Sequence, residues 1–290
     1  VPASTSILVP SNSSRLSPQP SKAKPATSRN RSPTGQSPVS KTRKPSQVAD
    51  PSSTSPKVKT WRGRVAKQFR KMHGASSPSS PTAPEGSTFG IPLDQCLTSS
   101  NNPYVPKFVE ICTDIVDARG LQTVGIYRVP GNNASITALL DEINRNYDEV
   151  PVEDPRWNDL HVVSSLLKAY FRKIPDSLMT SALYPSFIKA DKIENPEGRV
   201  KELKRLVKSL PPHNYHTLKH IVLHLKRVVE NSDVNKMEAK NLAIVFGPNI
   251  VRPEDDNMET MVNNMTHQCK IVETLLTAVS RFWEQKITVV

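Results

Sequence analysis

Apolar residues recur at three- and four-residue intervals along about 200 residues of this chain, the spacing of amphipathic helices. No stretch there shows the sustained alternation of polar and apolar residues that a half-buried strand requires. A segment of this length can bury one sizeable core. The sequence therefore predicts an all-α fold, with a single helical domain over residues 89–283. The apolar positions of the expected helices fall within 105–116, 136–143, 157–172, 200–210, 215–229, 238–246 and 271–283.

Glycine, proline and asparagine residues mark the ends of these helices. Gly120 is expected to end the first helix, and Pro175 is expected to end the third. Asn195 is a predicted helix cap, with Pro196 at the first helical position. The pair Gly247-Pro248 is expected to stop the helix at 238–246. These residues divide the domain into separate helices joined by short loops.

Positive charge is concentrated in the first 88 residues. They contain 15 of the 39 Lys and Arg residues, 2 of the 27 Asp and Glu residues and 13 of the 26 prolines, with a net charge of +13. The remaining residues have a net charge of −1, from 24 basic and 25 acidic side chains. Few large apolar residues precede Trp61, so burial cannot offset the entropy of ordering. We predict a disordered, basic Ser/Pro-rich tail at 1–59 and, since the domain is nearly neutral, no nucleic-acid binding.

Residues 60–73 form a distinct basic segment between the tail and a predicted linker at 74–88. Trp61, Val65, Phe69 and Met72 are spaced by four, four and three residues. The basic residues among them are Arg62, Arg64, Lys67, Arg70 and Lys71. As a helix, this segment would suit an anionic membrane surface. The alternative is a basic linker that happens to contain aromatic residues, since Gly63 and the short length weaken a helix.

Two predicted helices are joined by the stretch Gly125–Asn132, with the sequence GIYRVPGN. The glycines and the proline indicate a tight loop, and Ile126 and Tyr127 can anchor it to a core. Arg128 is then left as a permanently charged side chain on a supported loop. The planar guanidinium can make two charge-assisted hydrogen bonds at once, so Arg128 suits a phosphate group of a partner molecule.

Two later stretches of the sequence indicate, together with this loop, which family the chain resembles. The first is 164–175, with the sequence SSLLKAYFRKIP, and the second is 241–249, with the sequence NLAIVFGPN. In this order, the three stretches resemble the GTPase-activating domain of Rho-family GTPase regulators, the Rho GAP domain. The resemblance covers about residues 89–281. Pro130 departs from the small polar residue of many members, and this variant is similar to the large Rho GAPs of cell polarity, junctions and actin control that also contain PDZ and pleckstrin-homology domains.

The resemblance implies a role for each matching residue. Arg128 matches the arginine finger of the family. Lys168 and Arg172, four residues apart on one helical face, match residues that bind the GTPase and support the arginine loop. Asn249 matches an asparagine that contacts the GTPase near its switch region, and Asn241 is expected to hold the loop and the helix in place. Gly125 matches the glycine that precedes the finger.

The implied function is activation of another protein's reaction. Rho-family GTPases of the Rho, Rac or cell-division-cycle type bind GTP and Mg²⁺ themselves, so this chain is expected to need no cofactor of its own and not to be an enzyme by itself. A guanidinium inserted in trans would stabilise charge that develops on the phosphates. This would switch off Rho or Rac signalling to actin and cell polarity. The expected location is the cytoplasm, with recruitment to the plasma membrane or cell junctions, because no signal peptide or membrane-spanning run is evident.

Other chemistries find little support in the sequence. There is no Gly-rich phosphate loop followed by Lys-Ser/Thr, no zinc-type Cys/His spacing and no nucleophile elbow. His216, His220 and His224 recur every four residues on one predicted helix, but a polar helix face explains them without a metal, and no metal site is predicted. Two alternatives to GTPase activation stay open: a catalytically weak domain that only binds a GTPase, and a scaffold in which residues 60–72 bind a membrane.

Overall fold

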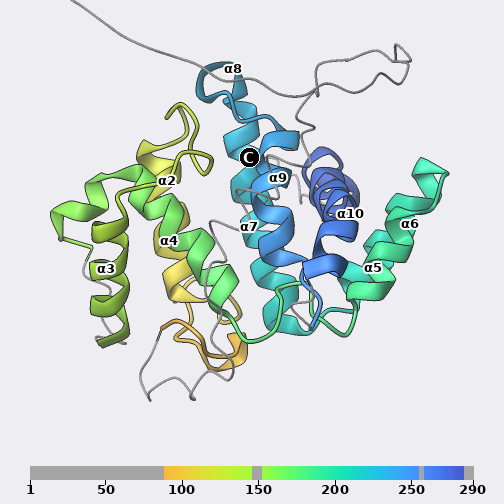
Figure 1. Ribbon diagram of the computed structural model, residues 1–290, viewed down its shortest axis with the longest axis horizontal. Coiled ribbons are helices and arrows are strands. Elements are labelled where there is room, and N and C mark those ends of the chain that lie inside the picture. The colour runs from red at the N-terminus through yellow and green to blue at the C-terminus, as the bar shows by residue number, and fades with distance from the viewer. Residues whose placement is uncertain (1–87, 146–151, 255–257, 284–290) are drawn as a thin grey trace, which may run out of the picture. The chain divides into compact units, whose positions relative to one another are not determined.

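The computed structural model describes residues 88–145, 152–254 and 258–283 (Figure 1). The predicted tail, the basic segment and all of the linker except Thr88 lie outside the described residues. Within them the chain forms helices and no strand, and an isolated antiparallel bridge joins Thr98 to Pro106. The all-α prediction is confirmed. The helices are η1 (Leu93–Gln95), α2 (Lys107–Arg119), α3 (Asn133–Arg145), η2 (Pro155–Asn158), α4 (Leu160–Lys173), α5 (Tyr184–Asp191), α6 (Pro196–Lys208), α7 (Pro212–Glu230), α8 (Ser232–Asn235), α9 (Ala239–Ile250), α10 (Met258–Thr277) and α11 (Val279–Phe282).

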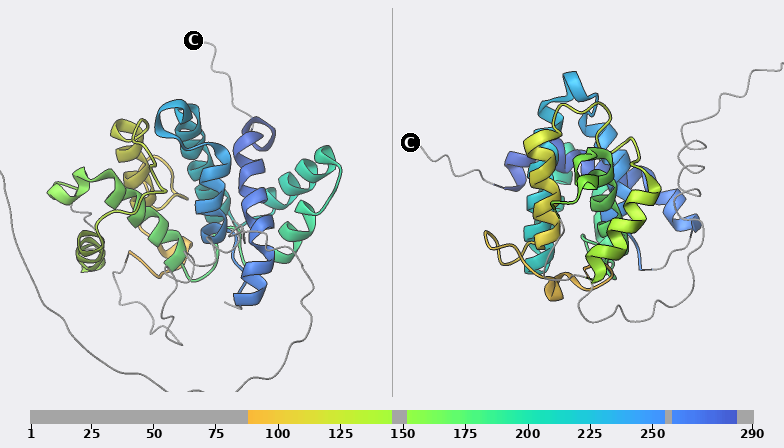
Figure 2. Two further views of the ribbon diagram at one scale, coloured as in Figure 1. Left: turned by 45° about the horizontal axis from the view of Figure 1, so that its top comes forward. Right: turned by 90° about the vertical axis from the view of Figure 1, so that its left-hand side faces the viewer.

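The helices pack around α7 and α9, which lie between two outer groups (Figures 1 and 2). Helices α2, α3 and α4 form one group, with α4 in contact with both α2 and α9. Helices α5, α6 and α10 form the other, and α10 packs along α9. Because α4 contacts α2, α3 and α9, it links the first group to the centre of the domain.

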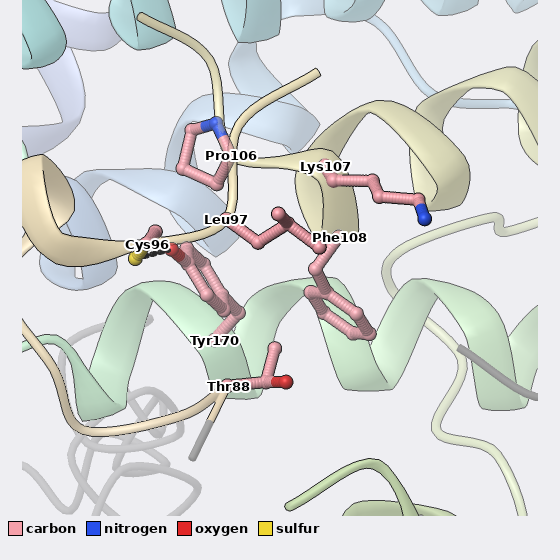
Figure 3. Close-up of a pocket in the computed structure, with 7 residues that line it drawn as sticks. All are labelled: Thr88, Cys96, Leu97, Pro106, Lys107, Phe108 and Tyr170. Carbon is pink, nitrogen blue, oxygen red and sulfur yellow. Dashed lines mark hydrogen bonds between the residues drawn. The ribbon is translucent and has the colours of Figure 1, made fainter. Parts of the chain in front are cut away.

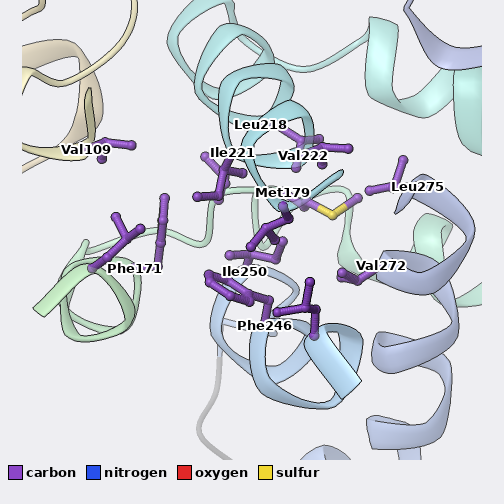
Figure 4. Packing of buried hydrophobic residues seen from close by; sticks show 14 of the residues in the cluster. Val109, Phe171, Met179, Leu218, Ile221, Val222, Phe246, Ile250, Val272 and Leu275 are labelled. Atoms are coloured by element: carbon purple, nitrogen blue, oxygen red, sulfur yellow. The ribbon is translucent and has the colours of Figure 1, made fainter. Parts of the chain in front are cut away.

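One hydrophobic core joins these helices (Figure 4). Val109 of α2, Phe171 of α4, Ile221 of α7, Phe246 of α9 and Val272 of α10 are all fully buried. Their apolar surface is removed from water on folding, and this is the dominant favourable contribution to stability. The periodicity in the sequence therefore identified the helix faces that meet in the centre.

Several predicted helix ends are confirmed. Gly120 follows the last residue of α2, and its N–H donates to the carbonyl of Val116. The side chain of Asn195 caps α6 by accepting from the N–H of Gly198, and Pro196 is the first helical residue. These ends depend on local backbone requirements, which is why the sequence predicts them.

The predicted stop at Gly247-Pro248 is wrong, because α9 continues through both residues to Ile250. Proline has no N–H to donate to the carbonyl four residues earlier, so α9 gives up one intrahelical hydrogen bond at Pro248. Gly247 packs so tightly on α10 that an added Cβ would lie 3.0 Å from the backbone nitrogen of Cys269. The packing of α9 on α10 therefore keeps this turn helical.

Three further differences concern helix boundaries. The third predicted helix begins at Leu160 rather than Trp157, because the Asp159 side chain caps α4 and Trp157 belongs to η2. The last predicted helix is interrupted at Ala278 between α10 and α11. Helix α5 was not predicted, since its eight residues contain too few turns to show a clear period.

None of the helices in the described ranges combines the length and apolarity that a bilayer span requires.

Candidate functional site

The loop at 120–132 joins α2 to α3 (Figure 1), and the backbone of Gly125 attaches it to the end of α8. The N–H of Gly125 donates to the carbonyl of Asn235 at 2.8 Å, and its carbonyl accepts from the N–H groups of Arg128 and Val129 at 2.9 and 2.8 Å. Its φ is +72°, and a Cβ here would lie 2.7 Å from Cγ2 of Val129. Only glycine meets both requirements without strain. Gly125 therefore sets the turn that leads to Arg128.

The next two residues anchor the loop to the core, as the sequence predicts. Ile126 and Tyr127 are fully buried. The ring of Tyr127 packs edge-on against Phe246 of α9, with 5.0 Å between the ring centroids. Tyr127 also has a φ of +68°, which is unfavourable for a residue with a side chain. The surrounding contacts must hold this conformation.

Arg128 follows Tyr127 and points its side chain into solvent. Arg128, Val129 and Pro130 are all exposed, in contrast to the two residues before them. The guanidinium lies beside Gly125, with Nη2 3.4 Å from the position that a Cβ of residue 125 would occupy. Within the described residues, its side chain makes no hydrogen bond or ion pair. A supported loop thus presents a guanidinium whose donors are available to another molecule.

Lys168 of α4 lies directly beneath the arginine loop. Only 8% of the residue is exposed, and its Nζ donates a hydrogen bond to the carbonyl of Tyr127. Burial, together with the charge of Arg172, lowers the pKa of Lys168 to about 8. Lys168 does not lie on a solvent-exposed helix face, because α4 is buried on nearly all sides from Val162 to Phe171.

The same helix face also fastens the far end of the loop. The hydroxyl of Ser165 accepts a hydrogen bond from the N–H of Gly131 at 3.1 Å. A Cβ on Gly131 would lie 2.5 Å from the backbone nitrogen of Val162, so the loop approaches α4 too closely for any other residue. Arg172 is half-buried one turn after Lys168, and burial lowers the pKa of its guanidinium. In the part of the chain that the structure describes, the side chain of Arg172 makes no hydrogen bond or ion pair.

The two asparagines of the third stretch lie at opposite ends of α9. The Nδ2 of Asn241 donates to the carbonyl of Lys236 at 3.1 Å and so links α9 to the end of α8. Asn249 is only 3% exposed, and its Nδ2 donates to the carbonyl of Val245 at 2.6 Å within the same helix. The structural role of Asn241 stays a prediction, and its bond to the carbonyl of Lys236 is consistent with it. Asn249 is turned inward here, and a contact with a partner would require its side chain to turn outward.

Three residues around the loop were missed by the sequence analysis. Asn235, fully buried at the end of α8, donates to the carbonyls of Leu121 and Val228 at 2.7 and 2.8 Å. His224 of α7 bonds the hydroxyl of Tyr127 at 2.5 Å and the carboxylate of Asp117 at 2.8 Å. Nothing in the sequence marks the contacts of Asn235 with Leu121 and of His224 with Tyr127 and Asp117, because these residues are about 100 positions apart.

The spaced histidines have partners within the protein. The ring of His216 stacks on Tyr104, with 4.7 Å between ring centroids, and Nε2 of His220 lies 2.8 Å from the hydroxyl of Thr113. His224 is buried rather than part of a polar face, so that interpretation is corrected for this residue. Among the described residues, no group of three or more His, Cys, Asp or Glu side chains could hold a metal ion.

A small cavity lies apart from the arginine loop, between the segment before α2 and helix α4 (Figure 3). Its volume is about 10 Å³, the space of about one water molecule. The Sγ of Cys96 lies 3.1 Å from the hydroxyl of Tyr170 at its edge. The cavity is too small for a substrate. Its lining residues are Thr88, Cys96, Leu97, Pro106, Lys107, Phe108 and Tyr170.

An exposed arginine on a loop that Lys168 and the surrounding helices hold fits the class of GTPase-activating domains. Residues 106–255 match the RhoGAP domain. The chain therefore belongs to the RhoGAP family.

Relatives and solved structures agree with this assignment. Rho GTPase-activating protein 21 of Xenopus tropicalis is 50% identical over 217 residues, which is 75% of this chain and 11% of that protein. The GTPase-activating protein pac-1 of Caenorhabditis elegans is 47% identical over 64% of this chain and 12% of its own length. The crystal structure of human Rho GTPase activating protein 15 has a TM-score of 0.63 and 34% identity, covering 72% of this chain and all of that chain. The chain thus spans about a tenth of the length of the first two relatives.

Proposed function

We propose that this domain accelerates GTP hydrolysis by Rho-family small GTPases and that Arg128 enters the GTPase active site in trans. Membership of the RhoGAP family supports the class of partner. The single observation that supports the residue is the exposed guanidinium of Arg128, placed directly after two fully buried residues. A charged group on so well anchored a support loses little conformational freedom on binding.

The chemistry follows from the charge of the phosphates. During hydrolysis, negative charge develops on the oxygens of the transferred phosphoryl group and of the leaving group. A guanidinium inserted from a second protein stabilises this charge in a site from which water is excluded. In related GTPase systems such a residue contributes about 10³–10⁵-fold to the rate. The GTPase supplies GTP, Mg²⁺ and the group that orients the attacking water.

The neighbouring residues have supporting roles in this proposal. Lys168 fixes the backbone of the arginine loop through the carbonyl of Tyr127. Arg172, half-buried and one turn further along α4, contributes positive charge beneath the loop and contacts the GTPase. Asn249 turns outward to meet the switch region of the GTPase, while Asn241 keeps α8 and α9 together.

Single-turnover GTP hydrolysis by purified Rho, Rac and cell-division-cycle GTPases tests this proposal. We expect the chain to accelerate hydrolysis by at least one of them, and Arg128→Ala to lose about 10³-fold or more of that acceleration. The matched control is Arg205→Ala, which removes an exposed arginine of α6 far along the chain from the loop. Equal acceleration by the chain and by Arg128→Ala would overturn the role of Arg128, and binding without any acceleration would leave a domain that only binds a GTPase.

We also propose that the basic segment at 60–73 brings the domain to anionic membranes, where lipid-anchored GTPases lie. Its cationic and aromatic residues are the supporting observation. Vesicle sedimentation with and without anionic lipid measures this binding. Binding that does not depend on anionic lipid would exclude the electrostatic version of this proposal.

A further inference from the structure

A chain of hydrogen bonds runs from the surface of the domain to the residue before Arg128. Arg227 of α7 bonds one carboxylate oxygen of Asp117, on α2. The other carboxylate oxygen lies 2.8 Å from Nδ1 of His224, on α7. Nε2 of His224 lies 2.5 Å from the hydroxyl of Tyr127. His224 is fully buried in the middle of this chain of bonds.

The direction of each hydrogen bond follows from the charges of the groups. Burial opposes ionisation of Asp117, but hydrogen bonds from His224 and Arg227 outweigh it and lower the pKa of this carboxyl group. The carboxylate can only accept, so Nδ1 of His224 is the donor. Burial lowers the pKa of His224 and raises that of Tyr127, so both are neutral. Nε2 therefore accepts, and the hydroxyl of Tyr127 donates.

Tyr127 is consequently held at three points. His224 binds its hydroxyl, Lys168 binds its carbonyl, and Phe246 packs against its ring. These contacts come from α7, α4 and α9. They maintain a positive φ that a residue with a side chain rarely adopts. The direction in which the next residue leaves the backbone depends on this conformation, and the next residue is Arg128.

We propose that His224 is a positioning residue for Arg128: by binding the hydroxyl of Tyr127, it fixes the left-handed conformation that aims the guanidinium. The inference rests on the proposed GTPase-activating function. It adds a contact from α7, on the inner side of the loop, to the support that Lys168 provides from α4. Asp117 does not contact Tyr127 itself; its carboxylate fixes the ring orientation and the tautomer of His224.

The test compares three variants in single-turnover hydrolysis at saturating domain concentration. Tyr127→Phe removes only the hydroxyl, His224→Leu removes the acceptor, and His224→Gln restores an acceptor oxygen near the position of Nε2. We expect the first two to lower the rate about three- to tenfold, the effect of one lost hydrogen bond, and the third to recover part of it. Affinity for the GTPase bound to a non-hydrolysable GTP analogue should stay unchanged.

A matched control separates positioning from general destabilisation. His220 lies one turn before His224 on α7 and bonds Thr113 of α2 instead of the arginine loop. We expect His220→Leu to leave the saturated rate unchanged. In the Arg128→Ala background, Tyr127→Phe should have no further effect, because its influence passes through Arg128. A full three- to tenfold loss in that background, or wild-type rates for Tyr127→Phe, would overturn the inference.

Hydrogen exchange provides a readout that does not depend on hydrolysis. The N–H groups of Arg128 and Val129 bond the carbonyl of Gly125, so their protection reports whether the loop keeps its turn. We expect faster exchange of both amides in His224→Leu but not in His220→Leu. Unchanged exchange in His224→Leu would contradict the positioning role. If instead Arg128→Ala does not affect hydrolysis while exchange responds as expected, the proposed function fails and the structural role of His224 is retained.

Discussion

Lys168 combines a buried charge with a hydrogen bond that the arginine loop needs. Removing an ammonium group from water costs free energy, and one bond to the carbonyl of Tyr127 repays only part of it. The lowered pKa expresses this cost. Lys168 therefore reduces the stability of the fold but holds Tyr127, the residue before Arg128. A functional role explains its presence better than a role in folding.

The first prediction concerns the pH dependence of stability that Lys168 produces. Its pKa is about 8 in the folded protein, against 10.5 when unperturbed. Between these two pH values Lys168 is protonated in the unfolded chain but not in the folded protein, so the free energy of unfolding rises with pH. Below pH 8 Lys168 is protonated in both states, and the destabilisation from burying its charge does not change with pH. We therefore expect the free energy of unfolding of the wild type, measured with urea, to increase by about 3 kcal/mol relative to that of Lys168→Met between pH 7 and pH 10.5. Other groups titrate in both proteins and cancel, so parallel curves would contradict the assigned burial.

The second prediction compares two glycines. Gly125→Ala introduces a Cβ at a φ of +72° and 2.7 Å from Val129, and we expect a loss of about 1–3 kcal/mol in stability together with reduced acceleration of GTP hydrolysis. Gly198→Ala, within α6, places its Cβ at an ordinary 3.5 Å from the nearest atom and should gain up to about 1 kcal/mol. Thermal unfolding and single-turnover hydrolysis measure both. Equal effects at the two positions would mean that the turn at Gly125 tolerates a side chain.

At the scale of elements, the arginine loop is attached to four helices. Helix α8 holds Gly125, α7 and α9 hold Tyr127, and α4 holds both Tyr127 and Gly131. Irregular segments gain rigidity only through such contacts, because they lack the regular backbone bonds of a helix. The four helices therefore act together as the support of one exposed side chain.

The third prediction tests the attachment to α8. Asn235→Ala removes the hydrogen bonds to the carbonyls of Leu121 and Val228, and it leaves the buried N–H of Met237 without its acceptor. We expect a loss of about 2–4 kcal/mol and faster amide exchange at Gly125. Asn231→Ala is the control, since its side chain makes a single exposed bond to the carbonyl of Arg227; it should change stability by at most about 0.5 kcal/mol. Similar losses for both variants would show that Asn235 has no special role.

The whole chain divides by charge into a basic first part and a nearly neutral domain. Residues 1–88 have a net charge of +13, and the remainder has −1. The proposed attraction to an anionic surface would act on the first part, whereas the residues proposed to promote hydrolysis belong to the second. The two properties are therefore separable in experiment.

The fourth prediction follows from this division. A protein comprising residues 88–290 should accelerate hydrolysis in solution as well as the complete chain does. On vesicles with anionic lipid and an anchored GTPase, the complete chain should be faster, and raising the salt concentration should abolish the difference. Replacing Arg62, Arg64, Lys67, Arg70 and Lys71 by Gln is the matched control. An equal advantage on neutral vesicles would contradict an electrostatic origin.

The sequence alone determined the helical class, most helix positions and the loop that presents Arg128. Gly120, Gly125 and Asn195 meet backbone requirements set by their immediate neighbours, and apolar spacing identifies the buried faces. The resemblance to Rho GAP domains depended on short motifs, which are also local. These features could be predicted because each depends on residues close together in the chain.

Only the tertiary structure decided the burial of Lys168, the continuation of α9 through Pro248 and the partners of Tyr127. Tyr127 and His224 are 97 positions apart, and Asp117 and His224 are 107 positions apart. No periodicity relates such residues, since their contact depends on how whole helices pack. The exposed arginine could therefore be predicted from neighbouring residues, but the hydrogen bonds and ring contact that aim it exist only after α2, α4, α7 and α9 have assembled.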